Sequence, residues 1–257
     1  MIITNQHTLE LYQQAGALST KILRELKAAV KPGVVPLDLD RLAENLCREN
    51  NVRPAFKGVN PGNPYQYSTC ISVNEVVVHG IPGRRPLQTG DVVKVDFGLV
   101  YQGLYTDHCF TVVVGKFSPL TKKLVTAARD SVQAAIPLAI IGNTTGDLGQ
   151  AMQAVAKSAG FDVLKQYTGH GIGRTLHDEP PIPAYGQAKT GVVLELNQVL
   201  CLESQVVAGS DQVELAADGW SVVTRDKALS AMFEYMVVVG EKQPIVLTQT
   251  LDWEMIG

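Results

Sequence analysis

The segment Val92-Val-Lys-Val-Asp96-Phe-Gly-Leu-Val100 is followed, after Tyr101-Gln102-Gly103, by Leu104-Tyr-Thr-Asp107-His-Cys-Phe110. Both runs are short and rich in β-branched or aromatic residues, and a turn sequence separates them. We therefore predict a β-hairpin. Each strand carries one acidic residue inside an otherwise apolar run, and this unusual feature guides the interpretation of the rest of the chain.

The register of this hairpin determines whether the two acids meet. A turn centred on Tyr101-Gln102 places Asp96 directly opposite Asp107, and one centred on Gln102-Gly103 makes them diagonal neighbours on one face. The intermediate register puts them on opposite faces. Two facing carboxylates about 5 Å apart repel strongly unless a cation lies between them. A solvent-facing acidic pair at the end of the hairpin is the alternative explanation.

Two further acids, Glu203 and Glu234, interrupt apolar strand sequences in the same way. An ionised carboxylate in such a strand needs an opposite charge, hydrogen bonds or a metal ion, unless the strand is an exposed edge. His170 stands among glycines in Gly169-His-Gly-Ile-Gly173, which permits close backbone approach. Four carboxylates and one imidazole suit two neighbouring ions of the Mn, Fe, Co or Zn type.

Hydrophobic periodicity and capping residues predict four helices and eight strands. The helices are Leu11–Ala29, Asp38–Arg48, Ser118–Ile140 and Asp147–Ser158. The strands are Cys70–Val73, Val76–His79, Asp91–Val100, Leu104–Val114, Val192–Leu196, Gln198–Val207, Ser221–Thr224 and Met232–Val239.

The order of two helices followed by strands occurs twice along the chain. A glycine followed five residues later by Asp-Leu also recurs, at Asp38-Leu39 and at Asp147-Leu148, with an offset of 109. We therefore expect one α+β domain, residues 1–257, built from two pseudo-symmetric halves of about 1–115 and 116–257. A site between the sheets of the two halves is expected.

The composition is that of a globular protein. The chain has 257 residues, a net charge of −3 and 46% hydrophobic residues, which excludes a disordered chain and gives no basic surface for nucleic acid or anionic membrane. No apolar run is long enough to span a bilayer, and the start has no signal-peptide pattern. The four cysteines lack paired spacing, which favours free thiols in a reducing cytoplasm, the expected location.

With these residues in place, the chain resembles the type I methionine aminopeptidases of the M24 metallopeptidase family, which shares the pita-bread fold with prolidases and creatinase. The similarity extends from the helix around Tyr12 to about Leu247, and its motifs are highly specific in combination. They are Cys70-Ile-Ser-Val-Asn-Glu75, Val78-His-Gly-Ile-Pro82, Gly90-Asp-Val-Val-Lys-Val-Asp96, Gly169-His-Gly-Ile-Gly173, His177-Asp-Glu-Pro180 and Asp218-Gly-Trp-Ser-Val-Val-Thr224. The resemblance implies an antiparallel sheet with helices on its outer face.

The resemblance also implies residue roles. The ligands of two divalent ions (Co, Mn, Fe or Zn) would be Asp96, Asp107, His170, Glu203 and Glu234. The substrate-contacting catalytic groups would be His79 and His177, with Glu203 as the base acting on the bridging water. The pocket for the first side chain would be lined by Tyr65, Cys70 and Trp220.

The implied activity is hydrolysis of the N-terminal methionine from nascent or short peptides whose second residue is small. Ribosome association is implied as well, with no nucleic acid or membrane as partner. Two alternatives stay open: a related M24 exopeptidase with another N-terminal residue preference, and a non-catalytic homologue that binds peptides or ribosomes.

Some positions depart from the pattern of the family, although all five implied ligands remain. These positions are the loop Val59–Tyr67, His108, Leu176, Ser204 and Tyr235. On a regular strand His108 alternates away from Asp107, so we interpret it as a residue of the opposite sheet face and not as a sixth ligand.

Overall fold

Side-chain caps precede three of the four helices in the described part of the chain. The computed structural model describes residues 1–249, and its helices are α1 (Gln6–Ala29), α2 (Pro36–Glu49), α3 (Pro119–Ala135) and α4 (Thr145–Ser158), with a 3-10 turn at Ile136–Leu138. The Asn5 side chain caps α1, and Ser118 caps α3 in a capping box with proline at the first helical position. The four predicted helices are therefore confirmed.

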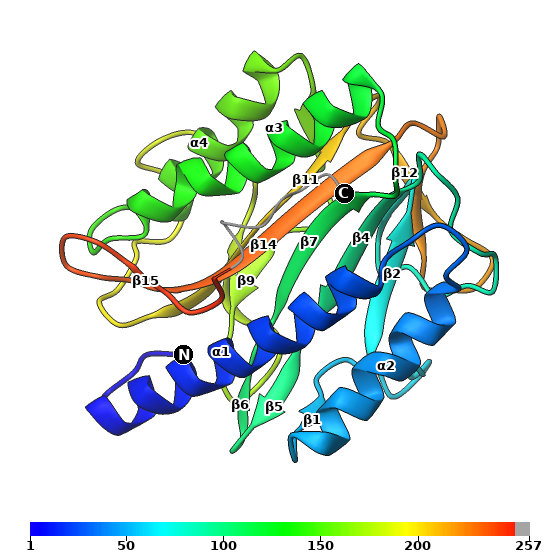
Figure 1. The fold of residues 1–257 in the computed structure, drawn as a ribbon. Helices are drawn as coiled ribbons and strands as arrows, with labels where there is room; N and C mark the ends of the chain where they lie inside the picture. Colours follow the sequence, from blue (N-terminus) through cyan, green and yellow to red (C-terminus); the bar gives the residue numbers. More distant parts are fainter. Residues whose placement is uncertain (250–257) are drawn as a thin grey trace.

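Within residues 1–249 the strands form three antiparallel sheets (Figure 1). The central sheet has the order β10-β9-β11-β14-β7-β4-β2, with β15 on β14 and β8 on β11, and the smaller sheets are β1-β5-β6 and β12-β13-β3. The first strands are β1 (Arg53–Pro54), β2 (Thr69–Val73), β3 (Val76–Val78), β4 (Val92–Phe97), β5 (Leu99–Tyr101), β6 (Leu104–Tyr105), β7 (His108–Val113) and β8 (Asp162–Val163). The remaining ones are β9 (Gly169–Gly171), β10 (Asp178–Ile182), β11 (Val199–Val207), β12 (Val213–Leu215), β13 (Val222–Thr224), β14 (Ser230–Val238) and β15 (Ile245–Val246).

The hairpin with the two acids adopts one of the alternative registers. Asp96 pairs with Cys109, and at the tip Tyr101 pairs with Leu104, as a turn centred on Gln102-Gly103 requires. The acids are therefore diagonal neighbours on one face. Each predicted strand is split in two, because the ladder breaks at Gly98, where an added Cβ would lie 2.1 Å from the Thr106 carbonyl oxygen.

One predicted strand, Val192–Leu196, is wrong. This segment makes a single bridge, between Thr144 and Val193, to the loop before α4. Its side chains Val192, Val193 and Leu196 are exposed. The aliphatic run has the composition of a strand, but it lies at the surface, where no neighbouring strand extends the ladder.

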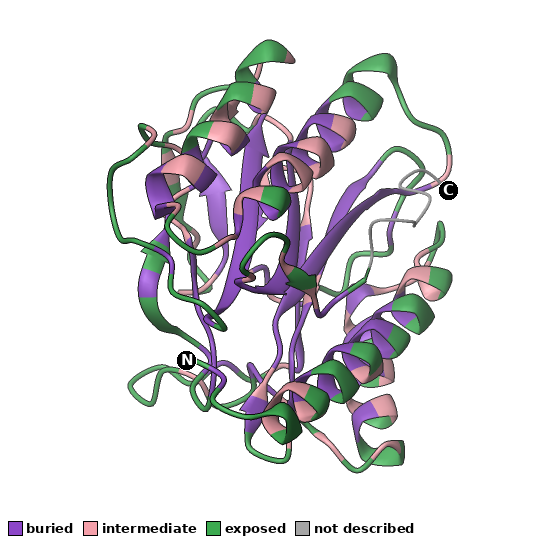
Figure 2. Ribbon diagram, turned by 90° about the vertical axis from the view of Figure 1, so that its left-hand side faces the viewer, coloured by how far each residue is buried: buried purple, intermediate pink, exposed green. Residues whose placement is uncertain are grey.

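All four helices cover the same face of the central sheet. One core cluster joins side chains of α1, α2, α3 and α4 to alternate residues of the central strands, including Val95, Phe110, Phe233 and Leu202. Figure 2 shows the buried strands beneath helices whose outer sides are exposed. The predicted α+β class, with helices on one face of an antiparallel sheet, is confirmed. The opposite face of the central sheet, which no helix of the described residues covers, carries the acidic residues described below.

The helices α2 and α4 are both 14 residues long and start 109 positions apart, which is the offset of the repeated Asp-Leu. The division into halves of about 1–115 and 116–257 stays a prediction. All four cysteines are free and buried. In the described part of the chain no helix has the length and apolar character needed to cross a bilayer.

Candidate active site

A row of side chains crosses five neighbouring strands on the sheet face that points away from the helices. The register pairs, in order, Cys70, Asp96, Cys109, Glu234 and Glu203. Directly paired residues point to the same face with their Cβ atoms about 5 Å apart. Strand pairing alone therefore gathers three carboxylates that are far apart in the sequence.

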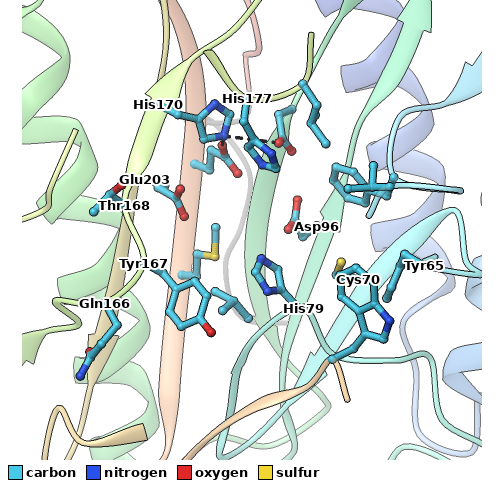
Figure 3. Close-up of a pocket in the computed structure, with 18 residues that line it drawn as sticks. Tyr65, Cys70, His79, Asp96, Gln166, Tyr167, Thr168, His170, His177 and Glu203 are labelled. Carbon is cyan, nitrogen blue, oxygen red and sulfur yellow. Dashed lines mark ion pairs between the residues drawn. The ribbon is translucent and has the colours of Figure 1, made fainter. Parts of the chain in front are cut away.

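Asp107 and His170 come from the next row of the same face. His170 pairs with Cys201 of β11, and the backbone N–H of Asp107 donates to Sδ of Met236 in β14. His170 Nε2 lies 3.8 Å from Asp107 Oδ2 and 4.0 Å from Glu234 Oε1, the contacts drawn as dashed lines in Figure 3. The second row thus adds one imidazole and one carboxylate to the first.

Glycines and one hydrogen bond fix the orientation of His170. A Cβ at Gly169 would lie 2.4 Å from the Cys201 carbonyl oxygen, so only glycine lets β9 approach β11 this closely. His170 Nδ1 lies 2.8 Å from the Gly171 carbonyl oxygen, which places the proton on Nδ1 and leaves the Nε2 lone pair facing the acids. Burial, with the charge of His177, lowers the pKa of His170 to about 4, so the ring is neutral and could serve as a metal ligand rather than as an ion-pair partner.

Burial raises the pKa of all four acids. It raises the pKa of Asp96 to about 7 and, with the charge of Asp96, the pKa of Glu203 to about 8. The pKa values of Asp107 and Glu234 are raised well above the ordinary range, first by burial and then by the neighbouring carboxylates. Without a cation these four groups cannot all be ionised at neutral pH.

The residues present fit divalent metal ions. Asp96 Oδ1, Asp107 Oδ1 and Glu234 Oε1 are buried without a hydrogen-bond partner, and potential ligand atoms of these three residues lie within 4.8 Å of one another. Two further groups meet the same distance: Asp107 with His170 and His177, and His170 with Cys201 and Glu234. Carboxylate oxygens and a neutral imidazole are the donors that such ions take.

The acids line a pocket of about 410 Å³. The structure brings every predicted site residue to this pocket: Tyr65, Cys70, His79, Asp96, Asp107, His170, His177, Glu203, Trp220 and Glu234. The sequence analysis missed Phe56, Val78, Gln166, Tyr167, Thr168 and Met232 as lining residues. Tyr167 and Thr168 directly precede the glycine-histidine motif, and Val78 begins the motif that contains His79. These positions are a signal that could have found the three residues.

In Figure 3, Asp96 lies between His79 and His177. The backbone of His79 has a φ of 57°, in the left-handed region that a non-glycine residue rarely adopts. Its ring meets the Tyr167 ring edge-on at 5.2 Å. Burial, with the charge of His177, lowers the pKa of His79 to about 4, so its imidazole is neutral and keeps one N–H to donate.

Tyr65 and Trp220 form the aromatic side of the pocket. Their rings meet edge-on at 4.9 Å. The Tyr65 hydroxyl is shared between the carbonyl oxygens of Thr69, at 2.9 Å, and Gly80, at 3.1 Å. The loop before Tyr65 is exposed as its proline, glycine and asparagine residues indicate, but Tyr65 itself is only 3% exposed.

Three of the departures from the family pattern point into the helical layer instead of the pocket. His108, Ser204 and Tyr235 each follow an acid of the site by one residue, so they face the other side of the sheet. His108 Nε2 lies 3.2 Å from Ser19 Oγ of α1, and Ser204 Oγ lies 2.8 Å from Ser131 Oγ of α3. The interpretation of His108 as a residue of the opposite face agrees with this contact. The departures Leu176 and Val59, by contrast, line the pocket.

Comparison with known proteins shows which family this chain is similar to. The model of metallopeptidase family M24 matches residues 10–241. A methionine aminopeptidase of Clostridium acetobutylicum is 36% identical, with 96% of this chain and 98% of that protein covered. Methionine aminopeptidase 1 of Bacillus subtilis is 35% identical, with 97% and 99% covered.

Solved structures extend the similarity to three dimensions. The crystal structure of methionine aminopeptidase from Thermotoga maritima superposes with a TM-score of 0.93 at 39% identity, covering 97% of this chain and all of that one. The prolidase from Pyrococcus furiosus, at 21% identity and a TM-score of 0.78, shares the fold over 97% of this chain and 66% of its own. The expected pita-bread fold is confirmed, and the family implies use of divalent metal. The chain belongs to metallopeptidase family M24.

Proposed function

We propose that this protein is a methionine aminopeptidase that removes N-terminal methionine from peptides and nascent polypeptides with a small second residue. Two divalent ions would be held by Asp96, Asp107, His170, Glu203 and Glu234. Metallo-aminopeptidase activity follows from family membership and from the methionine aminopeptidases at about 35% identity over nearly the whole chain. The number of ions, their ligands and the catalytic roles are the proposed part.

One observation supports the metal centre most directly. Three carboxylates converge with a buried oxygen each that accepts no hydrogen bond, and a neutral imidazole presents its Nε2 lone pair to two of these acids. Buried oxygens of this kind are costly unless a cation or a donor reaches them. The arrangement therefore favours metal ions over an acidic cluster without a function.

The side chains of the site divide the catalytic work. When bound, divalent ions supply Lewis-acid activation of a water and of the scissile carbonyl group. The Glu203 carboxylate accepts the proton of the attacking water. The neutral imidazoles of His177 and His79 donate hydrogen bonds, to the carbonyl oxygen as it gains negative charge and to the scissile amide respectively.

The pocket suits a methionine side chain. Tyr65, Trp220, Phe56, Val59 and Leu176 give it an apolar and largely aromatic wall. An unbranched, polarisable thioether packs well against aromatic rings. The nearby carboxylates attract a free amino terminus, which selects against peptides with a blocked one.

The test is a screen of peptides against metals. Protein stripped by a chelator is reloaded with Mn²⁺, Co²⁺, Fe²⁺ or Zn²⁺ and given Met-Gly-Met, the same peptide N-acetylated, and peptides with other first residues. We expect cleavage of Met-Gly-Met alone, and only after reloading. Asp107→Asn, purified in the same way, is the control for contaminating host peptidases.

Other outcomes identify the alternatives. Faster cleavage after another first residue indicates an M24 exopeptidase with altered preference. Binding of Met-Gly-Met without turnover under any of the four metals indicates a non-catalytic binding protein. Association with ribosomes and a cytoplasmic location stay predictions from the sequence.

A further inference from the structure

Gln205 is buried beside the candidate metal centre, and none of the roles described above uses it. It lies in β11 two residues after Glu203, so both side chains are on the same face of the sheet. Its cross-strand partner in β14 is Met232, which lines the pocket. Gln205 is 0% exposed. An amide in this position has to interact with the site and not with solvent.

The amide contacts the carboxylate of Glu203. Gln205 Nε2 donates a hydrogen bond to Glu203 Oε2, and the same nitrogen lies 3.9 Å from Sδ of Met232. With a cation bound, Glu203 is ionised and can only accept hydrogen bonds, so the amide presents its NH₂ group to this carboxylate. In that state the reversed amide would place two oxygens against each other.

The amide of Gln205 fixes one oxygen of Glu203, as the Cys201 thiol contacts the carboxylate of Glu234. Asp96, Asp107 and Glu234 each keep a buried oxygen without a hydrogen-bond partner, available to a cation. In Glu203 one oxygen is already engaged by a neutral donor. A carboxylate held in this way keeps one orientation and presents one oxygen to a metal or a water, because hydrogen bonds from neighbouring groups orient ligands.

Packing alone does not account for an amide at position 205. The Oε1 atom of Gln205 is itself buried without a hydrogen-bond partner, which is unfavourable. A methionine, as found opposite at position 232, would fill a similar volume without burying that oxygen. Burying the unpaired Oε1 of Gln205 costs stability. The other half of the amide, its NH₂ group, contacts Glu203.

We propose that Gln205 is a positioning residue that holds Glu203 through Oε2 and so leaves Oε1 as the oxygen that would serve a metal ion and accept the proton of water. The proposal rests on the proposed metallo-aminopeptidase function of this site. Gln205 touches neither the substrate nor the ions and acts through Glu203. Glu203 then serves both as a ligand and as the acceptor of the proton, with one fixed orientation for both roles.

The test replaces the amide by a side chain of similar length without a donor, Gln205→Met. The protein is loaded with Co²⁺, whose visible absorption spectrum reports its coordination, and Co²⁺ affinity is measured by calorimetry. We expect a changed spectrum, weaker Co²⁺ binding and a kcat lowered roughly 10-fold or more for Met-Gly-Met. KM should change much less, because the substrate pocket is intact.

Two further variants separate positioning from packing. Gln198→Met makes the same change at a buried glutamine that precedes β11 and bonds to the backbone of Glu195, so its spectrum should match that of the unchanged protein. The double variant Gln205→Met/Met232→Gln returns an amide from the facing strand and should restore part of kcat. If Gln205→Met does not fold, Gln205→Leu, which also lacks a donor, should give the same spectral change.

An unchanged Co²⁺ spectrum and affinity in Gln205→Met overturn the proposal, whether or not kcat falls. An equal loss of kcat in Gln198→Met also overturns it, since that result indicates general destabilisation. The spectra need no substrate. If they differ while the unchanged protein cleaves no methionyl peptide, the proposed function fails and the positioning role of Gln205 stands.

Discussion

Glu203 of β11 and Glu234 of β14 are direct cross-strand partners, and their side chains are only 8% and 2% exposed. The nine-residue pairing of the two strands holds these acids side by side before any ion arrives. Burial raises the pKa values of both, helped by the charge of Asp96 at Glu203 and by the charges of Asp107 and Glu203 at Glu234. The sheet therefore imposes an unfavourable arrangement of charge, which a bound cation relieves, so metal binding and folding stability must be linked.

Removing metal should make stability fall as pH rises. In the metal-free protein Glu203 has a pKa of about 8, against about 4.3 in the unfolded chain. Between these values the folded state keeps a proton that the unfolded state has lost, so stability falls steadily as pH rises from about 4.3 to about 8 and levels off above that. Chelated protein in urea should therefore lose stability between about pH 5 and pH 8, and saturating Mn²⁺ should restore it.

Other groups also titrate in this range, so Glu203→Gln is the control. This variant lacks the titrating carboxyl group, and its metal-free form should lose less stability than the unchanged protein over the same pH interval. Equal slopes for the two proteins would contradict the burial of a protonated Glu203 in the metal-free state.

The same substitution should remove the base of the reaction. Glu203→Gln keeps the size of the side chain but cannot accept a proton from water, so kcat for Met-Gly-Met should fall at least about 100-fold. Ser204→Ala, one residue along the strand, changes a side chain that contacts α3 on the opposite face, and its kcat should stay close to that of the unchanged protein. Comparable kcat values for Glu203→Gln and Ser204→Ala would refute the assigned role.

Trp220→Ala should weaken substrate binding more than catalysis. The Trp220 ring packs edge-on against Tyr65 and lines the pocket, but it does not belong to the metal-ligand groups. We expect KM for Met-Gly-Met to rise about 10-fold, the loss of roughly 1.4 kcal/mol of contact, with kcat within a few-fold. Phe117→Ala, which removes an exposed aromatic ring after β7, serves as the comparison. A kcat that falls as much as KM rises would mean that Trp220 also acts on the transition state.

The sequence predicted those parts of the site that depend on residue type and local pattern. Asp96 and Asp107 stood out because ionisable groups are rare in apolar strands, and alternation correctly placed His108 on the other face. The choice between registers could not be made, since both turn centres use acceptable turn residues. The strand pairing settled it.

Features that depend on tertiary contacts could not be predicted from the sequence. Val192–Leu196 has the composition of a strand, but a strand also needs a neighbour along its length, and the sequence does not show one. The contact between Gln205 and Glu203 depends on the pleat of β11 and on the side-chain conformations that the pocket permits. Phe56 and Gln166 reach the pocket from separate segments of the chain, and no motif marks them.

Asp40 supports the pocket from behind, and its removal should cost stability. Its Oδ1 accepts hydrogen bonds from the backbone N–H of Ser68, at 2.8 Å, and from the N–H and hydroxyl of Thr69, both at 2.9 Å. Asp40 is 4% exposed and lies in α2, so it ties this helix to the start of β2, directly before Cys70. Asp40→Ala leaves two buried backbone donors unpaired, and the free energy of unfolding should fall by about 2–4 kcal/mol.

Asp40→Asn distinguishes the hydrogen bonds from the charge. Burial raises the pKa of Asp40, which means that the site tolerates a neutral group, and the amide oxygen can accept the same three hydrogen bonds. Urea unfolding at saturating Mn²⁺ should therefore show a much smaller loss for Asn than for Ala. An Asn variant as unstable as the Ala variant would show that the negative charge of Asp40, rather than its geometry as an acceptor, holds α2 to β2.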